Sequence, residues 1–323
     1  MNQKPPVPAN SSLIERAAEI YGLREAMRGV PVASSVAAPV TVPVTETAVD
    51  LHQRVPEPVA AHIVAQPVQT RPTAPFTGKT ASIDLVALGE AGFIVPGAPP
   101  STLSEEFRLV KRQLLIQAFG GRNAPALDKG RLMLTCSAHA NEGKTFCSVN
   151  LALSMATETD IEVLLVDADV AKPEVLSTLG LPGGAGLMDA LADPRIDVET
   201  LVIKTNIPGL SVLPAGRQSN NDTELLASDR THELIAQLAS SNPRRIILFD
   251  SAPALAASPA SVLALHVGQI LLVVRADETT ESELREALAM LDGNARVQMV
   301  LNSVTYSGSN RKFGHYYGFG EKS

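Results

Sequence analysis

Short apolar runs alternate with helical stretches along most of the chain after residue 130. Six runs predict strands, at residues 132–135, 163–166, 211–213, 246–249, 270–274 and 297–301. Short buried strands that alternate with helices are typical of an α/β fold with a mostly parallel central sheet covered by helices on both faces. Because such sheets bind ligands at the carboxyl ends of their strands, the polar residues that follow these runs are the candidates for chemistry.

The first 80 residues follow another pattern. Ser12 and Glu15 have the spacing of a helix capping box, and the apolar residues after them recur at helical spacing, which predicts a short amphipathic helix that docks or stays solvated. A stretch rich in Pro, Val, Ala and Thr and poor in charge then predicts an extended linker. The expected organisation is a helix at 1–29, a Pro-rich linker at 30–80, a globular domain at 81–306 and a Gly-rich tail at 307–323.

The composition narrows the classes of function. The 323 residues carry a formal net charge of −7 and include no Trp, and this acidic balance argues against nucleic acid as the main partner. Cys136 and Cys147 are expected as small core residues in a reducing compartment rather than as a disulfide. The sequence shows no apolar run of about 18 residues and no N-terminal signal pattern, so we expect a cytoplasmic protein.

A phosphate-binding loop is predicted between the first strand run and the helix that follows it. The loop closes on Gly143, Lys144 and Thr145, where backbone N–H groups and the helix dipole would hold phosphate oxygens. In this interpretation Lys144 reaches the β- and γ-phosphates, and the Thr145 hydroxyl is a ligand of Mg²⁺. The candidate nucleotide-binding residues of the loop are Ala138, His139, Ala140, Asn141, Glu142, Gly143, Lys144, Thr145 and Phe146.

Two further strand runs end in carboxylates. Asp167 and Asp169 follow the run at 163–166, and because alternate residues of an extended chain lie on the same side, both carboxylates face one point. Such a pair suits Mg²⁺ or the acceptance of a proton, although two helix-capping acids would have the same pattern. Asp250 follows the run at 246–249 and is expected to support the metal, with an ordinary strand-end Asp as the alternative.

The order of these motifs resembles that of the bacterial tyrosine kinases (BY-kinases) of polysaccharide export, which are relatives of the ParA and MinD ATPases. The loop that ends at Thr145 is similar to their Walker A motif, and the strand that ends at Asp169 is similar to their Walker A′ motif. The similarity covers residues 82–323, and the N-terminal helix looks most like that of the autokinases of exosortase-linked (PEP-CTERM) exopolysaccharide clusters. Shorter matches are Gly186-Leu187, 213–216, 224–226 and Leu301-Asn302.

The resemblance implies a P-loop NTPase fold and an ATP-dependent protein-tyrosine autokinase that regulates exopolysaccharide synthesis or export. It implies catalytic roles for Lys144, Asp167, Asp169 and Asp250, with Asp167 accepting or orienting the proton of the tyrosine hydroxyl. Mg²⁺ would be organised by Thr145, Asp169 and Asp250. These roles come from the family and from the position of each residue in its motif.

The same resemblance assigns the phosphoryl acceptor and the adenine contact. In this family a C-terminal tyrosine cluster is phosphorylated in trans, and Tyr306, Tyr316 and Tyr317 lie in the last 18 residues of this chain, which has four tyrosines in total. Asn302, by its position in the family, would contact the adenine. Asn141 stands where the family often has Gly, and Asn tolerates the left-handed backbone conformation better than most residues.

Assembly and partners also follow from the resemblance. A charged helix is predicted at 103–117, and the family's assembly motif, a Glu and two Arg at three-residue spacing, matches Glu105, Arg108 and Lys111. Because Lys lacks the bidentate fork of Arg, a solvated charged face is the alternative to a ring or dimer. Such kinases are often activated by a membrane chain-length-determinant (Wzz-like) protein, which we expect as a separate chain that recruits this one to the inner membrane face.

Two other classes of function stay open. A ParA/MinD-like ATPase switch would carry a second Lys early in the loop, at the position that His139 occupies here. A non-catalytic adaptor of polysaccharide assembly would keep the fold for docking, yet Lys144 and the three strand-end aspartates are all present.

Overall fold

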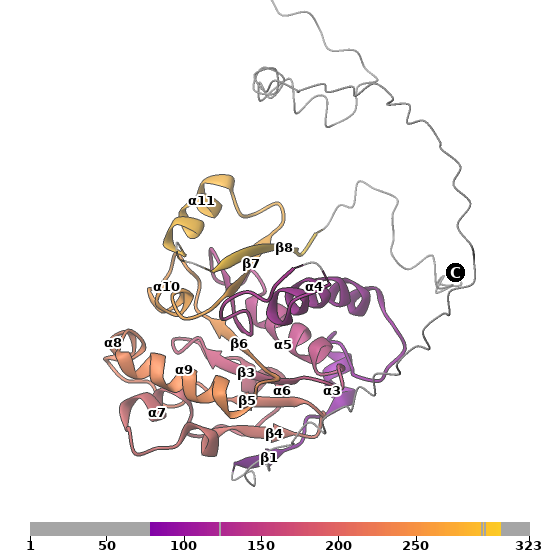
Figure 1. The fold of residues 1–323 in the computed structure, drawn as a ribbon. Coiled ribbons are helices and arrows are strands. Elements are labelled where there is room, and N and C mark those ends of the chain that lie inside the picture. Colours follow the sequence, from indigo (N-terminus) through magenta and orange to yellow (C-terminus); the bar gives the residue numbers. More distant parts are fainter. Residues whose placement is uncertain (1–77, 123, 292, 294, 305–323) are drawn as a thin grey trace, which may run out of the picture. The chain divides into compact units, whose positions relative to one another are not determined.

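One eight-stranded sheet organises the described part of the protein (Figure 1). The computed structural model describes residues 78–122, 124–291, 293 and 295–304. The strands are β1 (Lys79–Ala81), β2 (Leu132–Ser137), β3 (Glu162–Ala168), β4 (Ile203–Thr205), β5 (Leu210–Leu213), β6 (Arg245–Ser251), β7 (Gln269–Arg275) and β8 (Arg296–Asn302). Their order is β1-β4-β5-β3-β6-β2-β7-β8, and only the β4–β5 pair is antiparallel among these strands.

Helices cover both faces of this sheet. The α-helices are α3 (Leu85–Glu90), α4 (Thr102–Phe119), α5 (Lys144–Met155), α6 (Val175–Leu179), α7 (Leu187–Ala192), α8 (Asp222–Leu226), α9 (Asp229–Ser241), α10 (Pro259–Ala264) and α11 (Glu281–Met290). One apolar core lies between the sheet and α3 to α6, and the other lies between the sheet and α7 to α11. Adjacent residues of β3 go to opposite cores: Val163 and Leu165 to the first, Leu164 and Val166 to the second.

The predicted fold class is confirmed, and all six predicted strands are present as β2, β3, β5, β6, β7 and β8. The predicted charged helix is α4, and Cys136 and Cys147 are free and buried as expected. The sequence did not indicate β1 and β4, because each has three residues and no readable apolar period. The expected boundary after residue 80 falls inside β1, whereas the N-terminal helix, most of the linker and the tail lie outside the described residues.

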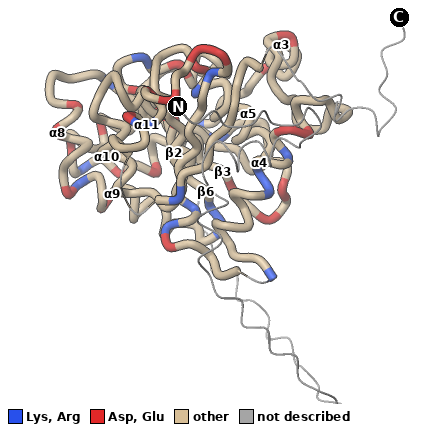
Figure 2. The backbone as a smooth tube through the Cα atoms, turned by 90° about the horizontal axis from the view of Figure 1, so that it is seen from above, with Lys and Arg blue, Asp and Glu red and all other residues tan. Residues whose placement is uncertain are grey.

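Residues of both charge signs, Lys and Arg as well as Asp and Glu, are interspersed along the backbone of the described part (Figure 2). The central strands β2, β3 and β6 are buried along almost their entire length. No helix among the described residues has both the length and the apolarity needed to cross a membrane.

Candidate active site

The loop between β2 and α5 has the backbone of a phosphate-binding loop. Gly143 precedes the helix in the left-handed conformation, with φ 92° and ψ 26°. A Cβ at this position would also lie 2.0 Å from the Asn302 side-chain nitrogen, so two independent constraints require Gly there. Asn141 has φ 63°, which confirms that this residue adopts the left-handed conformation.

Hydrogen bonds to the side chain and backbone of Glu142 fix the conformation of this loop. The buried Glu142 carboxylate accepts a hydrogen bond of 2.9 Å from the His139 backbone N–H and another from the Thr279 hydroxyl. The Glu142 backbone carbonyl accepts a bond of 2.9 Å from the Asn302 side-chain amide. The His139 amide is therefore already used within the loop, which narrows the predicted set of phosphate-binding amides. Sequence reasoning did not find Thr279, because no local motif marks it.

Asp250 at the end of β6 is fully buried and its two oxygens are both bonded. The Thr145 hydroxyl donates to Oδ2 at 2.7 Å and the Ser148 hydroxyl donates to Oδ1 at 2.9 Å. Burial raises the pKa of Asp250 to about 6, and the two hydroxyls and the Lys144 ammonium partly counter that rise. Sequence reasoning missed Ser148, although its place one helical turn after Thr145 puts both hydroxyls on the same face of α5.

Asp167 at the end of β3 lies opposite Asp250 in the β3–β6 register but is bonded differently. Its Oδ2 accepts a hydrogen bond of 3.0 Å from the Val175 backbone N–H. Its buried Oδ1 has no hydrogen-bond partner among the described residues. Burial, together with the nearby Asp250 charge, raises the pKa of Asp167 to about 8. The orphaned oxygen is thus a buried acceptor that a ligand could satisfy.

Asp169 and Lys144 complete the polar cluster. Asp169 is buried and accepts a hydrogen bond of 3.1 Å from the Lys172 backbone N–H. Burial raises the pKa of Asp169, and the Lys172 amide and the Lys144 ammonium counter that effect. Lys144 is itself buried at the start of α5, and its charge acts on both Asp169 and Asp250. The structure therefore brings together the four residues that the sequence predicted as catalytic.

The described residues contain no group of three or more His, Cys, Asp or Glu side chains that could hold a metal ion by themselves. A dicationic metal at this site would need further ligands from a substrate or from water. Mg²⁺ binds in that manner, through one or two carboxylates together with phosphate oxygens and water. The predicted set of Thr145, Asp169 and Asp250 is compatible with such partial coordination.

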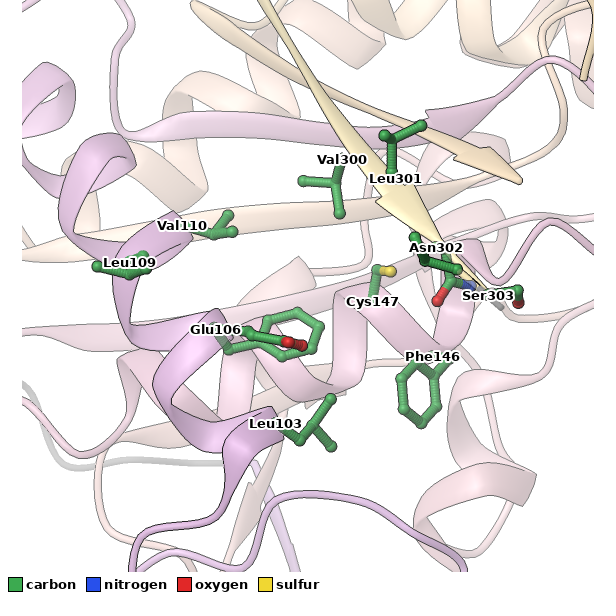
Figure 3. Close-up of a pocket in the computed structure, with 12 residues that line it drawn as sticks. Leu103, Glu106, Leu109, Val110, Phe146, Cys147, Val300, Leu301, Asn302 and Ser303 are labelled. Carbon is green, nitrogen blue, oxygen red and sulfur yellow. The ribbon is translucent and has the colours of Figure 1, made fainter. Parts of the chain in front are cut away.

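A cavity of about 440 Å³ opens beside the loop, and Figure 3 shows the side chains that line it. Phe146 and Cys147 from the start of α5 line this cavity together with Asn302, the last residue of β8, and Ser303, which follows the strand. Phe146 and Asn302 were predicted nucleotide contacts, and they line the same cavity. The adenine contact of Asn302 stays a prediction, because its amide nitrogen donates to the loop backbone in this structure.

The remaining predicted residues lie away from this cluster. Glu105 and Arg108 form an ion pair of 2.8 Å on α4. Lys111 is buried, donates to the Ser154 carbonyl at 3.0 Å and pairs with Glu158 at 2.7 Å, so its ammonium is held within its own chain. A role of these residues in assembly stays a prediction. Tyr306, Tyr316 and Tyr317 lie outside the described residues.

One of the shorter matched motifs has a structural reason. The backbone at Gly186 passes so close to the loop after β5 that a Cβ there would lie 2.0 Å from the Pro214 carbonyl oxygen. The next amide, that of Leu187, donates to the same carbonyl at 2.8 Å. This match therefore marks a tight junction between α7 and the loop after β5 rather than a site of chemistry.

Comparison with known proteins supports the interpretation of the sequence. No protein-family profile matches the chain. The tyrosine-protein kinase wzc of Salmonella typhi is 35% identical over 176 residues, which make up 54% of this chain and 24% of wzc. CapB of Staphylococcus aureus, a candidate tyrosine-protein kinase, is 27% identical over 222 residues, or 68% of this chain and 92% of CapB. The chain thus spans about a quarter of the length of relatives such as wzc.

Solved structures agree on the fold. The kinase domain of the Escherichia coli tyrosine kinase ETK matches with a TM-score of 0.54 and 23% identity, over 75% of this chain and 88% of that domain. The chimerical protein CapA2B2 matches with a TM-score of 0.55, over 70% of this chain and 93% of the chimera. The resemblance is confirmed: curated homologues are named tyrosine-protein kinases, and the chain has the fold of bacterial tyrosine-kinase domains.

Proposed function

We propose that this protein is an ATP-dependent protein-tyrosine kinase that phosphorylates tyrosines of its own C-terminal segment in trans. The observation that carries the proposal is the buried Oδ1 of Asp167, which has no hydrogen-bond partner among the described residues and lies at the end of β3 near the loop that precedes α5. A hydrolytic switch needs a water at this place, whereas a kinase needs an acceptor for the hydroxyl proton of its substrate. The names of the relatives, several of them tyrosine-protein kinases, favour the second use.

The loop and the start of α5 would bind the phosphates of ATP. The first amides of α5 have no side-chain cap, so they and the helix dipole point at this space with partial positive charge. The ammonium of Lys144 adds a full charge in a buried setting, where screening by water is weak. Phe146 and Asn302, in the cavity beside the loop, are placed to border the nucleoside.

The donor set also suits Mg²⁺. Asp169 and Asp250 are buried carboxylates whose pKa values are raised by that burial, and a divalent cation would offset the cost of keeping both ionised. Thr145 supplies a hydroxyl oxygen next to Asp250. When bound, the metal ion would neutralise charge that develops on the transferred phosphoryl group. Positioning by these side chains accounts for most of what the protein contributes to the reaction.

Asp167 would act on the acceptor tyrosine. A tyrosine hydroxyl has a pKa near 10, so it reacts faster when a carboxylate takes its proton. In the transfer, the tyrosine oxygen forms a bond to the γ-phosphorus as the bond between that phosphorus and its bridging oxygen breaks. The proton of the hydroxyl goes to the ionised form of Asp167, at Oδ1, and ADP leaves with the electron pair of the broken bond. Because the pKa of Asp167 is about 8 in the nucleotide-free protein, this acceptor form increases as pH rises toward and beyond that value.

We also propose a biological setting for this kinase activity. We expect regulation of exopolysaccharide synthesis or export in the cytoplasm, with assembly into a ring or dimer. Recruitment to the membrane would come from a separate chain-length-determinant protein that also activates the kinase. The family resemblance and the names of the relatives support this setting.

The test is phosphosite mapping on the purified full chain after incubation with ATP and Mg²⁺, with Lys144→Met as the matched control. Label on Tyr316 or Tyr317 in the wild type and none in the variant is the expected result. An absence of phosphotyrosine, even with the cytoplasmic segment of the membrane partner present, would overturn the proposal. Rapid ATP hydrolysis with nucleotide-dependent dimers would then favour an ATPase switch, and no nucleotide binding by calorimetry would favour an adaptor.

A further inference from the structure

Two strand ends far along the chain contact the loop between β2 and α5. Arg275 and Asn302 are the last residues of β7 and β8, and the register of the two strands places them side by side. The Ala276 backbone N–H also donates to the Asn302 carbonyl at 2.9 Å, which fixes the two strand ends to each other. Figure 3 shows Asn302 beside the start of α5, so this edge of the sheet borders the loop.

The side chains of Arg275 and Asn302 each donate a hydrogen bond to one backbone carbonyl of the loop. The Arg275 guanidinium donates to the Asn141 carbonyl at 3.2 Å. The Asn302 side-chain amide donates to the next carbonyl, that of Glu142, at 2.9 Å. An ion pair of 3.0 Å with Glu278 orients the guanidinium. Two consecutive loop carbonyls therefore point toward β7 and β8.

The backbone carbonyls and the backbone N–H groups of the loop are used in different ways. The N–H groups of residues 140–145 donate to no residue that the structure describes. Successive free N–H groups of this kind form a concavity that binds anions. The carbonyls, in contrast, accept hydrogen bonds: besides the two above, Ser137 accepts from the Ala254 N–H at 2.7 Å, Ala138 from the Leu255 N–H at 3.2 Å, His139 from the Ser137 hydroxyl at 2.6 Å and Gly143 from the Cys147 N–H at 2.9 Å.

The geometry of the peptide bond connects the bonded carbonyls to the free N–H groups. A trans peptide is planar, and its C=O and the N–H of the following residue point in opposite directions. A bond that holds the Asn141 carbonyl toward β7 therefore turns the Glu142 N–H away from β7. The bond to the Glu142 carbonyl has the same effect on the Gly143 N–H. Without these donors, either peptide plane would be free to turn its carbonyl oxygen toward bound phosphates, which that oxygen would repel.

Asn302 acts on the loop through the nitrogen that an adenine contact would also use. Its side-chain nitrogen donates to the Glu142 carbonyl and packs directly against Gly143, where a Cβ would lie 2.0 Å away. An effect of Asn302 on nucleotide affinity would then come through the phosphates rather than through the base. This difference can be measured, because a ligand without adenine would respond to Asn302 as strongly as ATP does.

We propose that Arg275 and Asn302 are positioning residues of the phosphate loop, which hold its carbonyls outward so that its N–H groups face the triphosphate. This inference rests on the proposed function, since it takes ATP as the ligand of the loop, and it adds two residues that act at that site from other strands. The loop would hold the phosphates equally before and during transfer. Loss of either donor should therefore weaken binding and leave the rate at saturating ATP unchanged.

Calorimetry on the full chain tests the role of Arg275, with ATP and Mg²⁺ in one series and inorganic tripolyphosphate and Mg²⁺ in the other. Arg275→Ala should raise both dissociation constants about tenfold, because a charged donor that orients the loop is lost. Arg275→Lys keeps a cationic donor and should restore both affinities to within about threefold of the wild type. The matched control is Arg285→Ala, which removes an exposed Arg that pairs with Glu281 on α11, and it should change neither constant.

The same two ligands test how Asn302 acts. Asn302→Ala should weaken the binding of ATP and of tripolyphosphate by the same factor, about fivefold for the loss of one neutral hydrogen bond. Initial rates of tyrosine phosphorylation should show a raised KM for ATP and a kcat within about twofold of the wild type. A loss for ATP alone would mean that Asn302 contacts the adenine, and it would overturn the positioning role of this residue.

Other results would overturn the role of Arg275. Unchanged affinities with Arg275→Ala, or no recovery with Arg275→Lys, would show that its bond to the loop does not matter for binding, even if the tyrosines are phosphorylated. The binding series needs no phosphoryl transfer, so weakened binding without any phosphotyrosine in the wild type would contradict the proposed function alone. The Arg275 side chain is 36% exposed, so circular dichroism should show an intact fold in its variants.

Discussion

The carboxyl ends of β3 and β6 lie side by side, yet they hold their aspartates in opposite ways. Asp250 on β6 is bonded through both oxygens to hydroxyls of α5. Asp167 on β3 faces it in register with one oxygen bonded and the other without a partner among the described residues. Both are buried, so the difference lies in how their oxygens are satisfied rather than in exposure.

This difference separates two uses of a buried carboxylate. An acceptor that is saturated by the protein fixes the elements around it, and here Asp250 ties the start of α5 to the central sheet. An acceptor that is left open raises the free energy of the folded state, and such a cost is typical of groups kept for a ligand or a reaction. We therefore expect removal of the two side chains to change stability in opposite directions.

The largest expected effect is on catalysis. Asp167→Asn should lower the rate of phosphotyrosine formation about 10³-fold, because an amide cannot accept the hydroxyl proton. Nucleotide affinity should change little, since Lys144 and the loop amides are untouched. The measurement is the initial rate of tail phosphorylation beside the affinity for ATP by calorimetry. An equal loss of affinity would show that Asp167 holds the nucleotide instead.

The second largest expected effect is on the stability of the protein when Asp250, at the end of β6, is replaced. Asp250→Ala should lower the free energy of unfolding by about 2–3 kcal/mol, because the Thr145 and Ser148 hydroxyls lose their acceptor in a buried place. Urea denaturation of the nucleotide-free chain measures this change. If Asp250→Ala left the free energy of unfolding unchanged or raised it, relief of charge repulsion would outweigh the two hydrogen bonds. The proposed difference between Asp250 and Asp167 would then be wrong.

The third expected effect is a gain in stability when Asp167 is replaced, and the size of this gain depends on pH. The pKa of Asp167 in the folded state is about 8, well above its unfolded value of 3.8, so the folded state binds the proton more tightly. The free energy of unfolding therefore falls as pH rises from about 4 to about 8. Asp167→Asn removes this loss and should stabilise the nucleotide-free chain by on the order of 1–2 kcal/mol at pH 8, and by less at pH 5.

Urea denaturation of wild type and variant at both pH values, with a chelator present, measures that gain. Asp169 and Asp250 also have raised pKa values, so the wild type and the variant share the slope that those two groups cause. Only the difference between the two chains reports on Asp167. A difference that is largest at pH 5 would reverse the argument and would indicate that Asp167 is ionised and stabilising in the folded state.

The sequence predicted which residues lie at the ends of the strands better than it predicted their hydrogen-bond partners. Strand ends could be read from apolar runs, so Lys144, Asp167, Asp169 and Asp250 were expected in one place, and the structure brings them together. Their hydrogen-bond partners could not be read, because Ser148 and Thr279 belong to no motif and their contacts depend on packing across 102 and 137 residues of chain. The short strands β1 and β4 were not predicted for the related reason that three residues show no period.

The smallest effect concerns Ser148, whose hydroxyl donates only to the satisfied carboxylate. Ser148→Ala should lower the free energy of unfolding by about 1 kcal/mol, since Oδ1 of Asp250 loses its donor and the methyl group fits the same space. Tail phosphorylation should stay close to the wild-type rate, because Thr145 still orients Asp250 from the other oxygen. The control is Ser261→Ala, at a half-buried residue whose hydroxyl bonds the local carbonyl of Ser258, and this change should alter stability by less than about 0.5 kcal/mol. If Ser148→Ala instead left stability unchanged but slowed phosphorylation as strongly as Asp167→Asn, the β6 end would take part in the reaction as directly as the β3 end.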